Sequence, residues 1–124
     1  MRLMVLAAHA WLALLAFDLA RPAGFARMCA WLQQRRPSSP PSGTAPSDIV
    51  WAVDEACVWY VKRTACLQRS VVATWLLRRH GIPAQLVIGC RALPFESHAW
   101  VEVDGRVIND LPQYQRAFVV LDRL

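Results

Sequence analysis

The sequence predicts an α+β fold in which helices come first and a small antiparallel sheet follows. Apolar residues recur at helical spacing as far as residue 80. From Gln85 onward, short apolar runs are separated by turn residues, which is typical of strands. Strands and helices do not alternate along the chain as they would around a parallel sheet. A chain of 124 residues fits one modest domain, because a domain of about this length buries roughly two-thirds of its unfolded surface.

The first 36 residues predict two short helices. An apolar run extends to Phe17 and resembles the hydrophobic part of a signal peptide, but it is short for a membrane span and lacks a small-residue cleavage site. The pair Arg21-Pro22 interrupts the helical pattern, so the second helix is expected over about residues 23–34. Contact of these helices with a membrane is the less favoured alternative to packing against protein.

The following segment, residues 37–47, has the composition of a linker. Proline and small polar residues dominate it, and such residues neither propagate a helix nor bury a core. We therefore divide the chain into an N-terminal helical segment over residues 1–36, a linker over residues 37–47 and a main domain over residues 48–124.

The main domain is expected to begin with two helices. Ser47 and Asp48 offer N-cap oxygens to a helix that runs to about Lys62. A second helix starts near residue 64 or 65 and runs to His80, where a Gly-Ile-Pro sequence stops it. Four strands are then expected, over residues 85–90, 98–103, 107–109 and 118–121.

Composition narrows the classes of partner. The chain has 14 basic and 9 acidic residues, a net charge of +5, and Lys62 is the only lysine. The arginines are scattered rather than grouped with aromatic residues in a stripe, so a nucleic-acid partner is not expected. An acidic peptide or protein fits the charge. The four cysteines include no CxxC pair, and with no convincing signal peptide we expect reduced thiols in a cytoplasmic protein.

Cys66 is the best candidate for a catalytic nucleophile. It stands near the start of a predicted helix, where unpaired amide N–H groups and the helix dipole stabilise a thiolate. A cysteine is more often a small core residue. We assign that role to Cys29, Cys57 and Cys90, which lie in apolar runs, whereas polar neighbours surround Cys66.

His98 and Asp110 supply the other two groups that thiol chemistry requires. A nucleophile needs a base that takes its proton and a third group that orients the base. Both residues follow Cys66 in the chain at spacings long enough for a helix, a strand and a hairpin to bring them together. The three residue types in this order predict cysteine acyl chemistry, with no cofactor and no metal.

Other polar residues are weaker candidates. His9 lies inside an apolar helix, and His80 stands at a helix C-terminus, where a capping role is expected. Glu102 shares the strand face of His98 and competes with Asp110 as the orienting acid, but it ranks well below it. A zinc site is not expected, because paired short-range ligands are missing. The six tryptophans favour packing, although Trp100 beside the base could line a peptide groove.

The hairpin at Asp104-Gly105 tests the assignment of the acid. A strict two-residue turn there would place Asp110 on the face opposite His98, because side chains alternate along a strand. A three-residue loop or a bulge would shift the register by one and return Asp110 to the face of His98. We predict such an irregularity.

Five motifs occur in order within residues 48–124, namely Ala65-Cys66-Leu67-Gln68-Arg69-Ser70, Gly81-Ile82-Pro83-Ala84, Leu86-Val87-Ile88-Gly89, His98-Ala99-Trp100-Val101-Glu102 and Asn109-Asp110. With this set the chain resembles the lasso peptide leader peptidases, which belong to the transglutaminase-like, papain-related cysteine peptidases. The resemblance implies a peptidase core of that type behind the N-terminal helices, with Cys66 as nucleophile, His98 as base and acid, and Asp110 as the orienting carboxylate.

The resemblance also implies a substrate and partners. The expected reaction removes the leader from a ribosomally made precursor peptide before a lasso cyclase forms the macrolactam. Some members of the family carry a fused leader-recognition domain, and the 47 residues before the peptidase motifs are too few for one, so a separate leader-recognition protein is expected. Two alternatives stay open: an acyltransferase or transglutaminase that uses the same three residues, and a non-catalytic module that binds the precursor.

Overall fold

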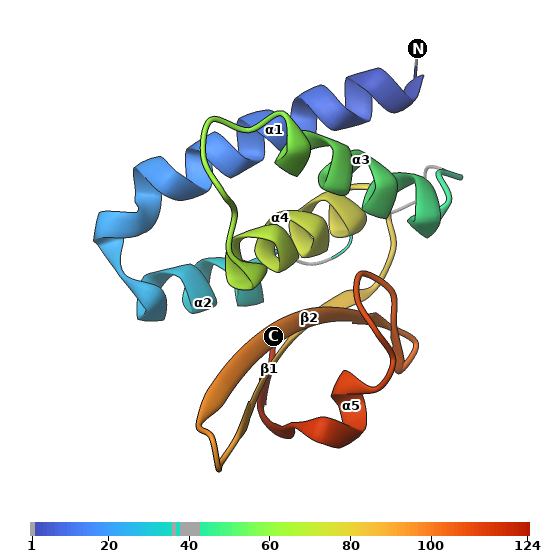
Figure 1. Ribbon diagram of the computed structural model, residues 1–124. Helices are drawn as coiled ribbons and strands as arrows, with labels where there is room; N and C mark the ends of the chain where they lie inside the picture. Colours follow the sequence, from blue (N-terminus) through green and yellow to red (C-terminus); the bar gives the residue numbers. More distant parts are fainter. Residues whose placement is uncertain (1, 36, 38–42) are drawn as a thin grey trace.

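The computed structural model describes residues 2–35, 37 and 43–124, and it confirms the α+β class (Figure 1). Helices precede a small antiparallel sheet. The helical elements are α1 (Arg2–Ala20), a 3-10 turn (Arg21–Ala23), α2 (Phe25–Gln34), α3 (Pro46–Val58), α4 (Cys66–Arg79) and the short α5 (Tyr114–Ala117). The strands are β1 (Ala84–Arg91), β2 (Glu96–Val103), β3 (Arg106–Val107) and β4 (Val119–Arg123).

The break between α1 and α2 falls where the sequence predicts it. A 3-10 turn contains Pro22, and Gly24 follows with a φ of 97°, a conformation that glycine adopts without strain. However, α1 continues past the apolar run, and by length and composition alone Arg2–Ala23 could cross a membrane, as the core helix of a soluble protein or a signal sequence also could. The helix is thus longer than the apolar run to Phe17 on which the expectation of too short a span rested.

Helix α3 begins differently from the prediction. Its N-cap is Ala45, which makes no side-chain cap, and Pro46 occupies the first turn, where its missing N–H costs nothing. Ser47 and Asp48 are therefore inside the helix rather than its caps. The helix also ends at Val58, earlier than expected. The predicted linker stays a prediction, and residues 38–42 within it lie outside the described part of the chain.

The four strands form one sheet in the order β3-β2-β1-β4. Strand β1 pairs antiparallel with β2 over eight residues, from Ala84 opposite Val103 to Arg91 opposite Glu96. Strand β4 adds to the other edge of β1, with a register shift between Ile88 and Gly89. The sequence analysis anticipated the strands but not α5, a single turn that carries the chain back to β4.

Two apolar clusters hold α4 at the centre of the fold. One joins α1, α3 and α4, where Leu14, Ile49 and Leu76 are fully buried. The other joins α2 and α4 to the sheet, with Leu32 and Leu86 fully buried. Figure 1 shows α4 between the helices and the sheet. Because α4 is packed from both sides, its first residues are held in a fixed position relative to β2.

Candidate active site

Cys66 is the first residue of α4 and is half-buried. Ala65 is the N-cap in extended conformation and makes no side-chain cap. The first hydrogen bond of the helix runs from the N–H of Arg69 to the carbonyl of Ala65, at 3.0 Å. The N–H groups of the first turn therefore have no partner within the helix, and such groups stabilise negative charge at a thiolate or an oxyanion.

His98 and Asp110 are in direct contact. Nε2 of His98 lies 2.9 Å from Oδ2 of Asp110, and both side chains are largely buried, with 16% and 17% of their surface exposed. The other carboxylate oxygen, Oδ1, accepts the N–H of Leu111 at 2.9 Å. The structure thus places the two residues expected to be base and orienting acid within hydrogen-bonding distance of each other.

The route by which Asp110 reaches His98 differs from the prediction. Asp104 and Gly105 form a strict two-residue turn, both with positive φ, and Val103 pairs directly with Arg106. The predicted three-residue loop or bulge was therefore wrong. The irregularity lies later, because β3 ends at Val107 and the register of the turn does not extend to Asp110.

Asn109 ends the ladder. The N–H of Ile108 still donates to the carbonyl of Val101 at 3.0 Å, but the N–H of Val101 donates to Oδ1 of Asn109 at 2.8 Å. A regular antiparallel pair would send that N–H to the carbonyl of residue 108. The buried Asn109 side chain replaces this carbonyl, and its Nδ2 donates to Oγ of Ser70 at 3.1 Å. The next residue, Asp110, can then leave the plane of the sheet.

Ser70 ties this arrangement to the helix of the cysteine. Its hydroxyl donates to the carbonyl of Ala99 at 3.2 Å. Ser70 lies one turn after Cys66 on α4, and Ala99 is next to His98 on β2. Helix and strand are therefore joined one turn from the thiol and one residue from the imidazole. Sequence reasoning gave no role to Ser70 or Asn109, although both stand in the quoted motifs.

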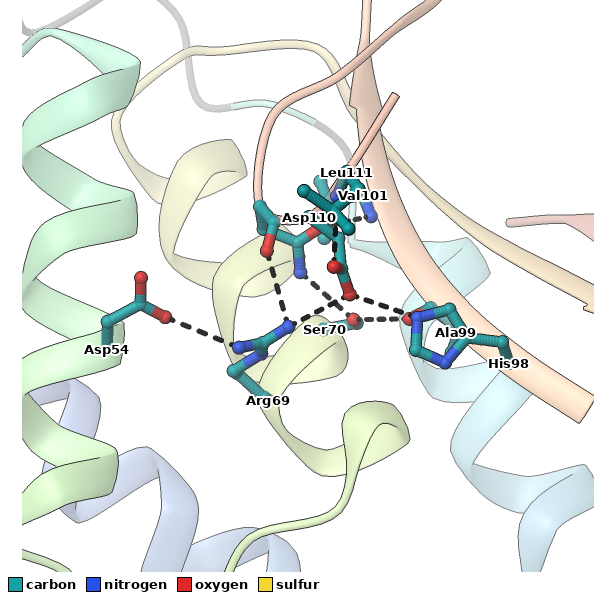
Figure 2. A network of polar contacts seen from close by, with 9 residues as sticks. Asp54, Arg69, Ser70, His98, Ala99, Val101, Asp110 and Leu111 are labelled. Carbon is teal, nitrogen blue, oxygen red and sulfur yellow. Dashed lines mark hydrogen bonds and ion pairs between the residues drawn. The ribbon is translucent and has the colours of Figure 1, made fainter. Parts of the chain in front are cut away.

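Arg69 is a further residue that sequence reasoning missed. Figure 2 shows its guanidinium between two carboxylates. Nη2 lies 3.2 Å from Oδ2 of Asp110 and 3.3 Å from the carbonyl of Asn109, and Nη1 lies 3.8 Å from Oδ1 of Asp54. Burial, with a contribution from the Asp110 charge, raises the pKa of Asp54 although Arg69 opposes this. One oxygen of Asp110 therefore serves both Arg69 and His98.

Aromatic rings lie around the imidazole. The His98 ring stacks on Trp100 at a centroid distance of 6.1 Å and lies 5.8 Å from the ring of Phe118. Trp100 is fully buried over Gly89, where an added Cβ would come within 2.8 Å of the indole. Because Gly89 pairs with His98 in the sheet, this close packing restricts the orientation of the base.

Two of the other candidates, Glu102 and His80, have structural contacts of their own. Glu102 is buried, accepts the indole N–H of Trp100 at 2.8 Å and pairs with Arg123. Burial opposes ionisation of Glu102, but these hydrogen bonds outweigh it and lower the pKa. His80 is the C-cap of α4, and burial lowers its pKa. Within the described residues, no three His, Cys, Asp or Glu side chains gather in a way that could hold a metal ion.

Comparison with known proteins identifies the family. The sequence pattern of the transglutaminase-like superfamily matches residues 12–123, nearly the whole chain. The chain belongs to this superfamily. Over 59 residues it is also 44% identical to the microcin J25-processing protein McjB of Escherichia coli. The matched segment covers 48% of this chain and 28% of McjB, so the chain spans well under half of that relative. No solved structure matches the chain.

Membership of the transglutaminase-like superfamily is consistent with a cysteine peptidase or a transferase. The match begins within α1, so the superfamily pattern includes part of the N-terminal helices. The superfamily match and the similarity to McjB confirm the resemblance inferred from the motifs.

Proposed function

We propose that this protein is a cysteine peptidase that removes the leader from a lasso precursor peptide. The observation that carries the proposal is the 2.9 Å contact between Nε2 of His98 and Oδ2 of Asp110, next to the helix that Cys66 begins. In this proposal Cys66 is the nucleophile, His98 the base and acid, and Asp110 the residue that orients His98.

The contact supports a division of roles between the ring nitrogens. In this proposal the N–H of Nε2 donates a hydrogen bond to Asp110, so Nδ1 is the nitrogen that exchanges a proton with the thiol. In the first step the Cys66 proton moves to Nδ1, and the sulfur attacks the carbonyl carbon at the junction of leader and core. The oxyanion that forms is stabilised by N–H groups of the first turn of α4.

The intermediate then collapses. The C–N bond breaks, and the proton on His98 passes to the leaving amine, which becomes the N-terminus of the core. The leader is left as a thioester on Cys66. A water molecule gives a proton to His98 and adds to the thioester, the C–S bond breaks, and the thiolate takes the proton back. The products are a leader with a free carboxylate and a core with a free amine.

Partners and compartment belong to the same proposal. A leader-recognition protein would present the precursor, and a lasso cyclase would take the core whose amine this reaction frees. The name of McjB as a microcin-processing protein supports a precursor peptide as substrate. We place the protein in the cytoplasm, where ribosomally made precursors appear and where thiols remain reduced.

The superfamily name favours one second candidate, an acyltransferase or transglutaminase. The same thioester would form, and its acyl group would then be transferred to an amine rather than to water. Mass spectrometry of the precursor after incubation in H₂¹⁸O separates the two reactions. Hydrolysis yields a leader carboxylate that carries one heavy oxygen, whereas transfer yields an amine adduct without it.

The test uses the precursor, a leader-recognition protein and two variants. We expect wild-type protein and Cys29→Ala to release leader and core, because Cys29 lies within α2 rather than at the start of α4. Cys66→Ala is expected to release neither. Equal processing by Cys66→Ala would instead favour a non-catalytic module that binds the precursor.

A further inference from the structure

A large apolar groove lies beside the start of α4. It has a volume of about 1030 Å³ and is walled by α1, α2 and α4. Typical small-molecule pockets measure roughly 300–1,000 Å³, so this groove is at the upper end of that range. Ala16 of α1, Met28 and Trp31 of α2, and Val71 and Trp75 of α4 are among its lining residues.

The groove extends to the start of α4. Ala65 and Leu67, the two chain neighbours of Cys66, both line it. Figure 1 shows α1 and α2 diverging from their common turn, with the start of α4 close to α2. A polypeptide that lies in the groove would therefore pass next to the first turn of α4, where the peptidase reaction is proposed to occur.

The charge of the groove is positive. Its charged lining residues are Arg21, Arg27 and Arg79, and its described lining includes no Asp or Glu. Arg21 is paired with Asp18 at 3.1 Å. Among the described residues, Arg27 and Arg79 form no ion pair with an acid, although Arg79 lies over the ring of Trp75. Two arginines beside an apolar surface favour a ligand that combines apolar side chains with carboxylates.

We propose that this groove binds a segment of the substrate polypeptide that carries apolar and acidic side chains, and that it guides the scissile bond to Cys66. The proposal rests on the peptidase function proposed above and adds a specificity determinant to it. The apolar walls supply contact area, while Arg27 and Arg79 select acidic over basic segments.

Binding can be tested apart from catalysis. Fluorescence anisotropy on the Cys66→Ala protein compares two synthetic peptides of equal length, one of leucine, phenylalanine and glutamate and one with lysine in place of glutamate. We expect the acidic peptide to bind more tightly, and the difference to shrink at high salt because screening weakens its carboxylate contacts. Equal affinity for the two peptides would overturn the proposal.

Variants locate the binding. The double charge reversal Arg27→Glu with Arg79→Glu is expected to lower the affinity for the acidic peptide about tenfold or more. Ala16→Trp, at an exposed position of α1, should block the groove and lower the affinity for both peptides. Arg106→Glu, on exposed β3 outside the groove, is the matched control and should bind like the parent. Circular dichroism establishes that each variant is folded. Unchanged binding in the folded groove variants would overturn the proposal.

Kinetics with a lasso precursor connect the groove to the reaction. In an otherwise wild-type protein, the groove variants should raise KM and leave kcat and the rate of Cys66 alkylation by iodoacetamide unchanged. If the acidic peptide binds but no precursor is cleaved, the proposed peptidase function is contradicted and the proposed binding role of the groove is retained. If all variants cleave the precursor equally, the proposed binding role of the groove is contradicted and the proposed peptidase function is retained. If the groove variants lost binding to anionic lipid vesicles but kept peptide binding, the groove would be a membrane contact and the proposal would be overturned.

Discussion

Oδ1 of Asn109 lies 2.8 Å from the backbone nitrogen of Val101, where a regular hairpin would place a main-chain carbonyl. This one side chain ends the ladder between β2 and β3 and lets the following residue turn toward His98. The position of the proposed orienting acid therefore depends on an amide that takes no part in the proposed chemistry.

Replacing Asn109 by alanine should weaken both stability and activity. The substitution leaves the buried N–H of Val101 without its partner, which costs about 1–3 kcal/mol, and removes the bond to Ser70. We expect a lower free energy of unfolding in urea and a reduced kcat. Gln115→Ala, which loses an exposed hydrogen bond to the carbonyl of Gly105 and a side-chain hydrogen bond to Glu102, is the control and should be affected less than Asn109→Ala. A fully active Asn109→Ala would mean that Asp110 is positioned by other contacts.

Features of the fold that depend on many residues were easier to predict from the sequence than features that depend on one or two. Helical spacing and turn residues predicted the order of helices and strands, because these patterns reflect burial over many residues. The break at Pro22 followed from one residue whose backbone constraint is local. The helix start at Pro46 was missed because nearby capping residues gave a competing signal.

Site residues were less predictable when their role depends on tertiary contacts. The sequence indicated His98 and Asp110 by residue type and order, and the structure brings the two together. It could not indicate how they meet, because Asn109 completes a bond with Val101 that no local pattern encodes. Arg69 was missed for a similar reason, since an arginine on a helix is usually a solvated side chain. Its position three residues after Cys66 was the one available signal.

Asp110→Asn should strongly reduce kcat while leaving the protein folded. An amide can hold the imidazole only through a different pattern of donors and acceptors, which favours the wrong tautomer of His98. By comparison with another triad, the expected loss in kcat is about 10⁴-fold. Glu102→Gln is the matched carboxylate control, because Glu102 binds Trp100 and Arg123 instead of His98. A loss as large in that variant would point to a general effect on folding.

Arg69 should act as a positioning residue for Asp110. Arg69→Gln removes the cation that contacts Oδ2 of Asp110 and the carbonyl of Asn109, so we expect kcat to fall about tenfold with little change in KM. Arg69→Lys retains the charge but not the two-contact geometry and should recover part of kcat. Asp54→Asn should have a smaller effect, because that carboxylate is half-exposed and 3.8 Å away. Unchanged kcat in Arg69→Gln would exclude this role.

Asp18 should make stability depend on pH. Burial opposes its ionisation, but hydrogen bonds from Tyr60 and Lys62 outweigh this and lower the pKa of Asp18 from 3.8 to about 2. A depressed pKa adds stability that is present above pH 3.8 and is lost as pH falls through 2. Asp18→Asn should therefore be less stable than wild type at pH 7, with the difference vanishing near pH 2.

The hydrogen bond between Tyr60 and Asp18 should also make stability fall at high pH. Its hydroxyl donates to Oδ2 of Asp18 at 2.5 Å, and burial together with this carboxylate raises the pKa of Tyr60 from 10 to about 12. The stability it contributes is present below pH 10 and is lost as pH rises through 12. Tyr60→Phe should lose the pH dependence at high pH and keep part of it at low pH, because Lys62 still contacts Asp18. Urea denaturation across pH measures both effects, and parallel curves for wild type and variants would contradict them.

The most direct test of the proposed chemistry is the intact mass of the protein during turnover. Wild-type protein mixed with the lasso precursor and quenched in acid should carry a covalent adduct with the mass of the leader acyl group. Peptide mapping should place it on Cys66, and Cys66→Ala should show none. Release of leader by Cys66→Ala, or an adduct mapped to another residue, would contradict the assignment of Cys66 as the nucleophile.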